Sequence, residues 1–255
     1  MTARVEVVQR LRAAGCVWAE DEADLLLASG GDVEAKVARR AAGEPLEVVL
    51  GHATLAGVRV ELDAGVFVPR RRSELLVRLA RDGAAAAPGV PVVVDLCCGS
   101  GAVGVAVVDG LPAAVLHAAD VDPVAVACAR RNVEPLGGSV HLGDLYDALP
   151  DGLRADVLVV NAPYVPTAEV DLLPREAREH EPRTALDGGS DGVELHRRVA
   201  AGAPAHLAAG GLLLIETSTA KSALTAAAVE AAGLTSSVAH DDDLEATVVL
   251  GRLRT

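Results

Sequence analysis

The sequence predicts an α/β fold: a mostly parallel sheet that ends in an antiparallel hairpin, preceded by a small helical unit. Three observations predict it. From residue 92 onward, short apolar runs alternate with segments of helical length. A glycine-rich turn follows the first of these runs directly. The last two runs have no helix-length segment between them, so they should pair as antiparallel neighbours.

The composition fits one large domain or one domain with a small appendage. The chain has 255 residues, of which 51% are hydrophobic and 23% charged, so a sizeable core is available. None of the four cysteines forms a metal-type CxxC spacing, and we expect reduced thiols, an intracellular, cytoplasmic protein and no metal. Neither a signal-peptide pattern nor a membrane-spanning run is expected.

The formal net charge of −13 argues against sequence-independent nucleic-acid binding, because an acidic surface repels phosphate backbones. A local basic patch remains at Arg70-Arg71-Arg72, which can equally be the solvated start of a helix. Direct nucleic-acid binding is therefore not expected.

The first 68 residues predict two small units before the main sheet. Residues 1–45 favour helices, with Asp32 capping a helix that stops at Gly43. Residues 46–68 predict a linking β-hairpin whose strands lie at 48–50 and 58–62. Ser73-Glu74 then opens a helix.

The remaining elements follow from apolar runs and their punctuation. Asp122-Pro123 should open a helix, with Asp122 as its cap, and Gly210-Gly211 should end a helix before the fifth strand. The predicted strands lie at 92–96, 114–119, 139–142, 155–160, 211–216, 234–239 and 245–250.

The turn after the first strand has the pattern GxGxxG at residues 99–104. Glycines let a ligand approach the main chain, although the same pattern also serves as a structural turn. Asp120 ends the second strand, where a carboxylate can bind ribose hydroxyls. After the third strand, Asp144 could accept from an adenine amino group while Leu145 covers the base. These features fit NAD and S-adenosylmethionine equally well.

The fourth strand favours methyl transfer to nitrogen, because it is followed by Asn161-Ala162-Pro163-Tyr164. The Asn161 side-chain oxygen and the Ala162 carbonyl can hold the two hydrogens of an amide or amine and stabilise charge developing on its nitrogen. Pro163 and Tyr164 can pack on the flat group. His180-Glu181 resembles an acid–base or metal pair, although no second ligand cluster accompanies it. Glu216 is expected to border the cleft, and the turn Asp187-Gly188-Gly189 to shape its rim.

At these residues the chain resembles the HemK-type protein-(glutamine-N5) methyltransferases, and within them an actinobacterial-type side branch. The resemblance runs from about Pro45 to the C-terminus. The segments that carry it are Phe67-Val68-Pro69-Arg70, Asp95-Leu96-Cys97-Cys98-Gly99-Ser100-Gly101, Asn161-Ala162-Pro163-Tyr164 and Glu181-Pro182-Arg183-Thr184-Ala185-Leu186-Asp187-Gly188-Gly189.

The resemblance implies a seven-stranded Rossmann-like methyltransferase sheet over 69–255 and a helical domain at 1–45 that docks the protein substrate. It implies S-adenosylmethionine as cofactor, S-adenosylhomocysteine as product, and an exposed glutamine on a release factor or ribosomal protein as acceptor. Asn161, Ala162, Pro163 and Tyr164 would hold that glutamine. The expected cofactor-binding residues are Phe67, Arg70, Asp95, Cys97, Cys98, Gly99, Ser100, Gly101, Asp120, Val121, Asp144, Leu145 and Asn161.

Two single positions and one three-residue segment depart from the family pattern. Ala162 replaces a proline, Leu145 stands where members often carry an aromatic residue, and Arg71-Arg72-Ser73 replaces a Pro-Glu-Thr-like segment. Three alternatives stay open at this point: a nucleobase amino-methyltransferase, a non-catalytic methyltransferase-like binding module, and a nicotinamide oxidoreductase.

Overall fold

The computed structural model describes residues 3–111 and 113–254. Its main feature is a seven-stranded sheet with the strand order β5-β4-β3-β6-β7-β9-β8. Strands β3 to β7 are parallel, whereas β9 runs antiparallel to both β7 and β8. The predicted fold class is confirmed. The strands are β3 (Val92–Leu96), β4 (Val115–Asp120), β5 (Ser139–Leu142), β6 (Ala155–Val160), β7 (Leu207–Thr217), β8 (Thr235–Asp241) and β9 (Ala246–Arg252).

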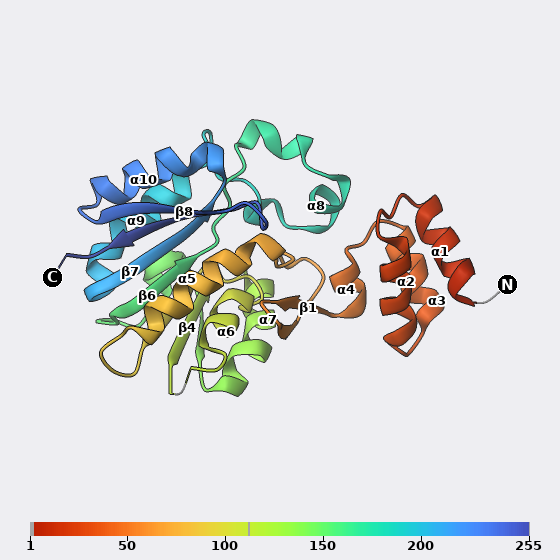
Figure 1. The fold of residues 1–255 in the computed structure, drawn as a ribbon, viewed down its shortest axis with the longest axis horizontal. Coiled ribbons are helices and arrows are strands. Elements are labelled where there is room, and N and C mark those ends of the chain that lie inside the picture. Colours follow the sequence, from red (N-terminus) through yellow and green to blue (C-terminus); the bar gives the residue numbers. More distant parts are fainter. Residues whose placement is uncertain (1–2, 112, 255) are drawn as a thin grey trace.

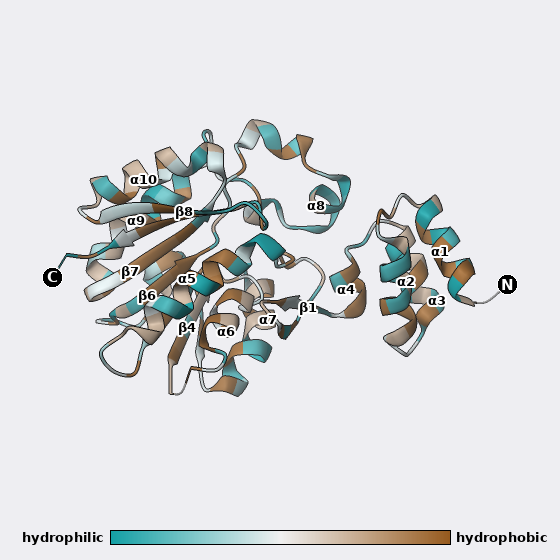
Figure 2. Cartoon of the chain, viewed as in Figure 1, coloured by the Kyte–Doolittle hydropathy of each residue, from teal (hydrophilic) through white to brown (hydrophobic). Residues whose placement is uncertain are grey.

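Helices cover both faces of this sheet (Figure 1). On one face lie α5 (Glu74–Ala85), α6 (Ala102–Val108) and α7 (Pro123–Val133), and on the other α9 (Glu194–His206) and α10 (Ser222–Ala231). Val93 packs on the face covered by α5, α6 and α7, and the next residue, Val94, packs on the face covered by α9 and α10, because successive side chains along a strand point to opposite faces. Figure 2 shows apolar residues along β4, β6 and β7, which are buried from both sides.

The N-terminal helices are α1 (Ala3–Ala13), α2 (Ala19–Ala28) and α3 (Val33–Ala41), and they lie apart from the sheet (Figure 1). They share a small core of their own, which includes Leu11, Leu26 and Val37. Asp32 caps α3 as predicted, since its Oδ1 accepts a hydrogen bond of 3.0 Å from the Ala35 amide. The domain boundaries themselves stay a prediction.

Two local predictions were wrong. The first concerns residues 48–50, which belong to a short helix, α4 (Leu46–Leu50), and not to a strand. In the helix, Val48 packs in the core under the sheet domain and Val49 in the core of the N-terminal helices. Gly51 ends the helix with a positive φ of 76°. The linking hairpin is present, but its strands are β1 (His52–Leu55) and β2 (Val58–Glu61). The second wrong prediction is that Gly210-Gly211 ends a helix. The helix α9 already ends at His206, and both glycines lie inside β7, where the pairing of β7 with β6 shifts its register.

A long segment joins β6 to α9 beyond the carboxyl ends of the strands. It contains the short helices η4 (Thr167–Leu172), α8 (Arg175–His180) and η5 (Arg183–Ala185). The other 3-10 turns are η1 (Arg71–Ser73), η2 (Glu134–Leu136), η3 (Leu145–Ala148) and η6 (Thr219–Lys221). Across residues 3–111 and 113–254, every helix is too short or too polar to traverse a lipid bilayer.

Helix α9 has a glycine where a tyrosine ring rests against it. The Tyr146 ring stacks on His206 at a centroid distance of 4.3 Å, and its hydroxyl donates to the Val199 carbonyl at 2.7 Å. A Cβ added at Gly202 would lie 2.3 Å from Tyr146 Cε2. Only glycine therefore fits this position of the helix.

We predict that Gly202→Ala lowers the free energy of unfolding by about 1–3 kcal/mol, as overpacking does. The gain in helix propensity, about 1 kcal/mol, is smaller than the cost of displacing a ring held at both ends. Urea unfolding measures the difference. Gly83→Ala in α5 is the matched control, because its nearest atom is the flexible tip of Leu212 at 3.0 Å. Equal stability of the two variants would contradict the prediction.

Candidate active site

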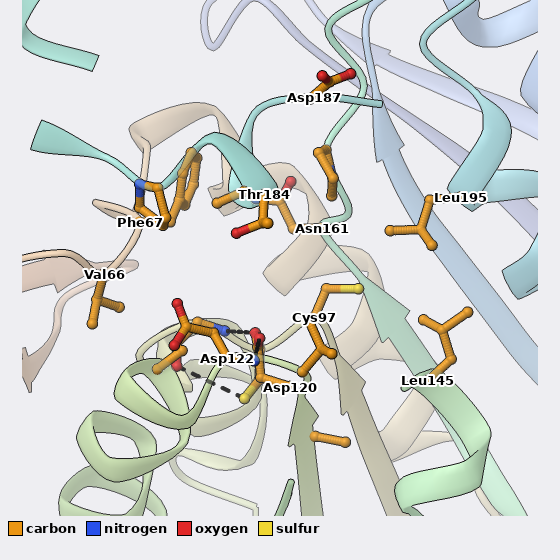
Figure 3. A pocket seen from close by; sticks show the side chains of 18 of the residues that line it. Val66, Phe67, Cys97, Asp120, Asp122, Leu145, Asn161, Thr184, Asp187 and Leu195 are labelled. Carbon is orange, nitrogen blue, oxygen red and sulfur yellow. Dashed lines mark hydrogen bonds between the residues drawn. The ribbon is translucent and has the colours of Figure 1, made fainter. Parts of the chain in front are cut away.

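A cavity of about 720 Å³ opens at the carboxyl ends of β3, β4 and β6. Its walls come from the turn after β3, the ends of β4 and β5, the loop after β6, the segment before α5 and the long segment before α9. Figure 3 shows side chains from all these parts facing one another, among them Phe67, Asp120, Leu145, Asn161 and Thr184. Parallel sheets place ligand sites at this edge.

Asp120 organises the loops at the bottom of the cavity. Its Oδ2 accepts from the Gly99 amide and its Oδ1 from the Asp122 amide, both at 2.9 Å (Figure 3). Burial raises the pKa of this carboxyl group, and the amide hydrogen bonds oppose that shift. Each carboxylate oxygen can accept more than one hydrogen bond, so Asp120 still has acceptor capacity. Asp122 is the predicted cap of α7, because its Oδ1 accepts from the Val124 amide at 2.8 Å.

The three glycines of the GxGxxG turn have different environments. Gly99 lines the cavity with a φ of 55°. The atom nearest to a Cβ added at Gly99 would be Phe67 Cβ, 4.0 Å away, so the Gly99 backbone is open to a ligand. Gly101 lies outside the wall, where an added Cβ would meet Val133 at 2.9 Å. Gly104 packs equally closely on Asp95, whose buried Oδ2 accepts from the Gly104 amide at 2.8 Å.

Burial affects the ionisable groups of this turn. It raises the pKa of Asp95 to about 7 and also raises the pKa values of the Cys97 and Cys98 thiols. These thiols are thus protonated and unreactive. Cys97 and Leu145 line the cavity with positive φ values of 57° and 50°. Such strain at non-glycine residues is typical of functional sites.

Val121 and Asp144 also line the cavity, but Asp144 is not free. Arg198 of α9 donates a hydrogen bond of 2.7 Å to Asp144 Oδ2, and both side chains are about half exposed. The sequence reasoning missed Arg198, which lines the same wall. A ligand amino group that reaches Asp144 must therefore share it with this guanidinium.

The loop after β6 presents only part of the predicted tetrad to the cavity. Asn161 and Pro163 line it, whereas Ala162, 1% exposed, and Tyr164 lie behind the wall. Asn161 Nδ2 donates to Ser73 Oγ at 3.2 Å, and among the described residues its Oδ1 has no donor. Asn161 thus offers an acceptor atom, as an amide-binding group requires. Burial raises the pKa of Tyr164 to about 12, so its hydroxyl stays protonated.

Glycines of the long segment support this loop from behind. An added Cβ at Gly188 would lie 2.7 Å from the Pro163 carbonyl oxygen, and one at Gly192 would lie 2.5 Å from that of Tyr164. The Gly188 amide also donates to the Val165 carbonyl at 2.8 Å. The predicted rim residues 187–189 do line the cavity. Their additional role in packing against the tetrad backbone was not visible in the sequence.

Arg70 and Glu181 join the segment before α5 to the long segment before α9. Arg70 does not line the cavity; its guanidinium pairs with Glu181 Oε1 and lies 5.1 Å from the Phe67 ring centroid. Glu181 is thus a partner of Arg70, in place of the predicted acid–base pairing with His180. Within residues 3–111 and 113–254, no cluster of three or more metal-ligating side chains was found.

His196 of α9 lies under the tetrad and was also missed by the sequence reasoning. It is fully buried, and its Nδ1 forms a hydrogen bond of 2.9 Å with Thr225 Oγ1. Its ring centroid is 6.3 Å from that of Tyr164. Burial lowers the pKa of His196 to about 4, and the nearby Ala162 backbone opposes this shift. A neutral imidazole therefore supports the loop.

Comparison with known proteins identifies the family. Residues 62–177 match the family model "Methyltransferase small domain". A release factor glutamine methyltransferase of Cereibacter sphaeroides is 37% identical over 225 residues, which cover 86% of this chain and 78% of the relative. The chain belongs to the release factor glutamine methyltransferase family. This confirms the HemK-type resemblance.

Other relatives show how far the similarity extends. The Geobacter sulfurreducens release factor glutamine methyltransferase is 41% identical, and the match covers 71% of this chain but only 63% of the relative's length. A 4-amino-L-phenylalanine/4-methylamino-L-phenylalanine methyltransferase of Streptomyces pristinaespiralis is 37% identical, covering 81% and 73%. A methyltransferase from Pyrococcus furiosus has the same fold, with a TM-score of 0.57 at 16% identity, covering 87% and 100%.

We predict that acidification destabilises the protein through His196. Its pKa of about 4 in the folded state lies below the unfolded value of 6.5, so the unfolded state binds more protons between these values. Its contribution to stability is complete above pH 6.5 and lost as the pH falls through about 4. The loss is about 3 kcal/mol.

Chemical denaturation of the wild type and His196→Gln at several pH values measures this contribution. The difference between the two proteins isolates His196, because Asp95, whose pKa of about 7 is raised, changes stability in the opposite direction in both. A difference that does not vary between pH 7 and pH 4 would show that His196 is not buried in its neutral form.

Proposed function

We propose that this protein transfers a methyl group from S-adenosylmethionine to the side-chain amide nitrogen of a glutamine in a protein substrate. The observation that carries the proposal is the shared cavity: Gly99, Asp120 and Asn161 line the same space, and Asn161 offers its carboxamide oxygen there. Membership of the release factor glutamine methyltransferase family supports the choice of reaction.

The cavity fits the proposed cofactor in size and in chemistry. The open backbone at Gly99 suits a charged or polar ligand group, and the spare acceptor capacity of Asp120 suits two ribose hydroxyls. Val121 and Leu145 supply apolar contacts for a base, and Phe67 closes the opposite side. The proposal includes no metal. When bound, S-adenosylmethionine supplies a methyl group on a positively charged sulfur, so the transfer requires no strong base.

Asn161 would act on the acceptor. An amide nitrogen is a weak nucleophile, because its lone pair is shared with the carbonyl group. Asn161 Oδ1 accepts one of its hydrogens, which orients the nitrogen and stabilises the positive charge that develops on it. Ala162 lies outside the cavity lining, so Asn161 Oδ1 is the acceptor that this loop's side chains offer, and the second amide hydrogen would face solvent. As the nitrogen–carbon bond forms and the carbon–sulfur bond breaks, one amide proton passes to solvent.

The acceptor we propose is an exposed glutamine of a peptide chain release factor, with a ribosomal protein as the other protein candidate. Several similar relatives carry the name release factor glutamine methyltransferase, including those from Geobacter and Cereibacter. The helices α1 to α3 form a unit with its own core, on the same side of the molecule as α8 (Figure 1), which suits a role in docking a protein. We place the reaction in the cytoplasm.

An aromatic amine is the second candidate acceptor. The relative from Streptomyces pristinaespiralis, 37% identical, is named for methyl transfer to an amino group on a phenyl ring. An amino group on a flat ring presents two hydrogens, as a carboxamide does. Asn161 Oδ1 can therefore accept from this amino group as well, and an assay with both acceptors distinguishes the two candidates.

The decisive assay supplies labelled S-adenosylmethionine together with a release factor, ribosomal proteins or 4-amino-L-phenylalanine, and maps the methyl group by mass spectrometry. We expect the label on a glutamine side chain. Label found only on the free amino acid would favour the second candidate, and label found only on nucleic acid would exclude both.

We predict that Asn161→Ala lowers kcat about 100- to 1,000-fold, as for the loss of a donor or acceptor aimed at developing charge. Cofactor affinity should change little. Asp120→Ala is the paired variant: it should weaken S-adenosylmethionine binding by about 1–3 kcal/mol, as for a lost hydrogen bond to a charged group. Calorimetry and steady-state kinetics separate these effects. Normal turnover by Asn161→Ala would refute its assigned role.

A further inference from the structure

Ser73 lies between the amide-binding Asn161 and a buried carboxyl group, Glu216. Ser73 and Glu216 are each 1% exposed, so neither exchanges hydrogen bonds freely with water. Ser73 Oγ accepts from Asn161 Nδ2 at 3.2 Å. Burial raises the pKa of Glu216, and the nearby Ser73 hydroxyl opposes that shift. The serine therefore faces a donor on one side and an acceptor on the other.

The sheet fixes this arrangement. Val160 of β6 pairs with Ile215 of β7, so the next residues along the two chains are neighbours: Asn161, which directly follows β6, and Glu216, which is still within β7. Ser73 reaches them from the turn that opens α5. Three elements that are distant in sequence thus meet at one point beside the cavity.

Glu216 is held by one cation and has one oxygen to spare. Arg72 Nε donates to Glu216 Oε1 at 3.4 Å, and the Arg72 guanidinium also lies 5.7 Å from the Tyr164 ring centroid. The adjacent Oε2 has no hydrogen-bond partner of good geometry among the described residues. A buried acceptor of this kind requires a donor, and the Ser73 hydroxyl, which can rotate about its C–O bond, is the group placed to supply it.

A hydroxyl group has one proton and two lone pairs. If that proton is directed at the Glu216 carboxylate, Ser73 Oγ presents only lone pairs to Asn161. The carboxamide of Asn161 can then turn only its NH₂ group towards Ser73, which leaves Oδ1 for the cavity. Without the carboxylate, the hydroxyl could donate to Oδ1 instead, and the carboxamide could bind in the flipped orientation.

We propose that Ser73 and Glu216 are positioning residues that fix the orientation of the Asn161 carboxamide, so that its oxygen, and not its nitrogen, faces the acceptor. The inference rests on the proposed function, because the oxygen is needed only to receive an N–H group. A flipped Asn161 would present a donor to the acceptor's own N–H hydrogens and repel them. The network therefore selects acceptors that bring hydrogens to the site.

The kinetic test uses Ser73→Ala, Ser73→Thr and Glu216→Gln. We expect Ser73→Ala and Glu216→Gln to lower kcat about 10- to 100-fold, the range for residues that orient a functional group, with the KM for S-adenosylmethionine unchanged. Ser73→Thr keeps the hydroxyl group and should retain turnover near the wild-type value. In the Asn161→Ala background, Glu216→Gln should have no further effect on kcat, because its effect passes through Asn161.

A measurement that requires no turnover tests the orientation directly. In ¹⁵N NMR spectra, the Asn161 side-chain amide protons should exchange slowly in the wild type and in Ser73→Thr, and rapidly in Ser73→Ala. Thr217→Val is the matched control, because it removes another buried hydroxyl next to Glu216 in the chain. The hydrogen-bond partner of the Thr217 hydroxyl is Thr225, at 3.5 Å. It should leave the exchange of the Asn161 amide unchanged.

The outcomes separate the two proposals. If the Asn161 amide protons exchange slowly only when Ser73 is present, but the wild type methylates no glutamine, the proposed function is refuted and the inferred orientation of Asn161 stands. Glutamine methylation with unchanged kcat in both Ser73→Ala and Glu216→Gln would overturn the positioning role. Additive losses in the double variant Asn161→Ala/Glu216→Gln would also overturn it, since the carboxylate would then act by another route.

Discussion

The pairing of β6 beside β3 is the constraint on which the site depends. Because Leu96 lies opposite Val160, the glycine-rich turn after one strand and the Asn161 loop after the other emerge from the same edge of the sheet. The pairing of β4 with β3 brings Asp120 to that edge as well. A shift of β6 by one residue would turn Val160 over and move Asn161 away from the cavity.

Several buried contacts convert this placement into a fixed geometry. Asp120 ties the turn after β3 to the start of α7 through two backbone amides. Gly188 and Gly192 allow the long segment to lie directly on the tetrad backbone. His196 supports the same loop from the helix layer below. These contacts are made mainly by backbone groups and buried polar side chains, which pre-organise a site for developing charge.

The elements set by local chemistry could be predicted from the sequence. The apolar runs of β3 and β6 are bounded by polar residues and turns, and the caps Asp32 and Asp122 act on amides two or three residues away. The tetrad was found because Asn161 follows a buried strand directly. Each of these signals lies within a few residues of the element or site that it predicts.

The remainder depends on contacts between distant parts of the chain. Nothing near Ser73 reveals that Asn161, 88 positions later, donates to it, and the Asp144–Arg198 pair spans 54 positions. Residues 48–50 have strand propensity, but packing of their side chains against two cores favours the helix. Ala162 and Tyr164 were assigned to the site by their neighbours in sequence, whereas the turn of the chain after Asn161 places them behind the wall.

The central claim is that the reacting sulfur and the Asn161 carboxamide share one space. A crystal structure of the protein with S-adenosylhomocysteine tests it most directly. The account predicts the ribose on Asp120, the base beside Leu145 and the sulfur directed at Asn161 Oδ1, with room for one amide group between them. A ligand bound elsewhere, or a sulfur separated from Asn161 by a wall of side chains, would contradict it.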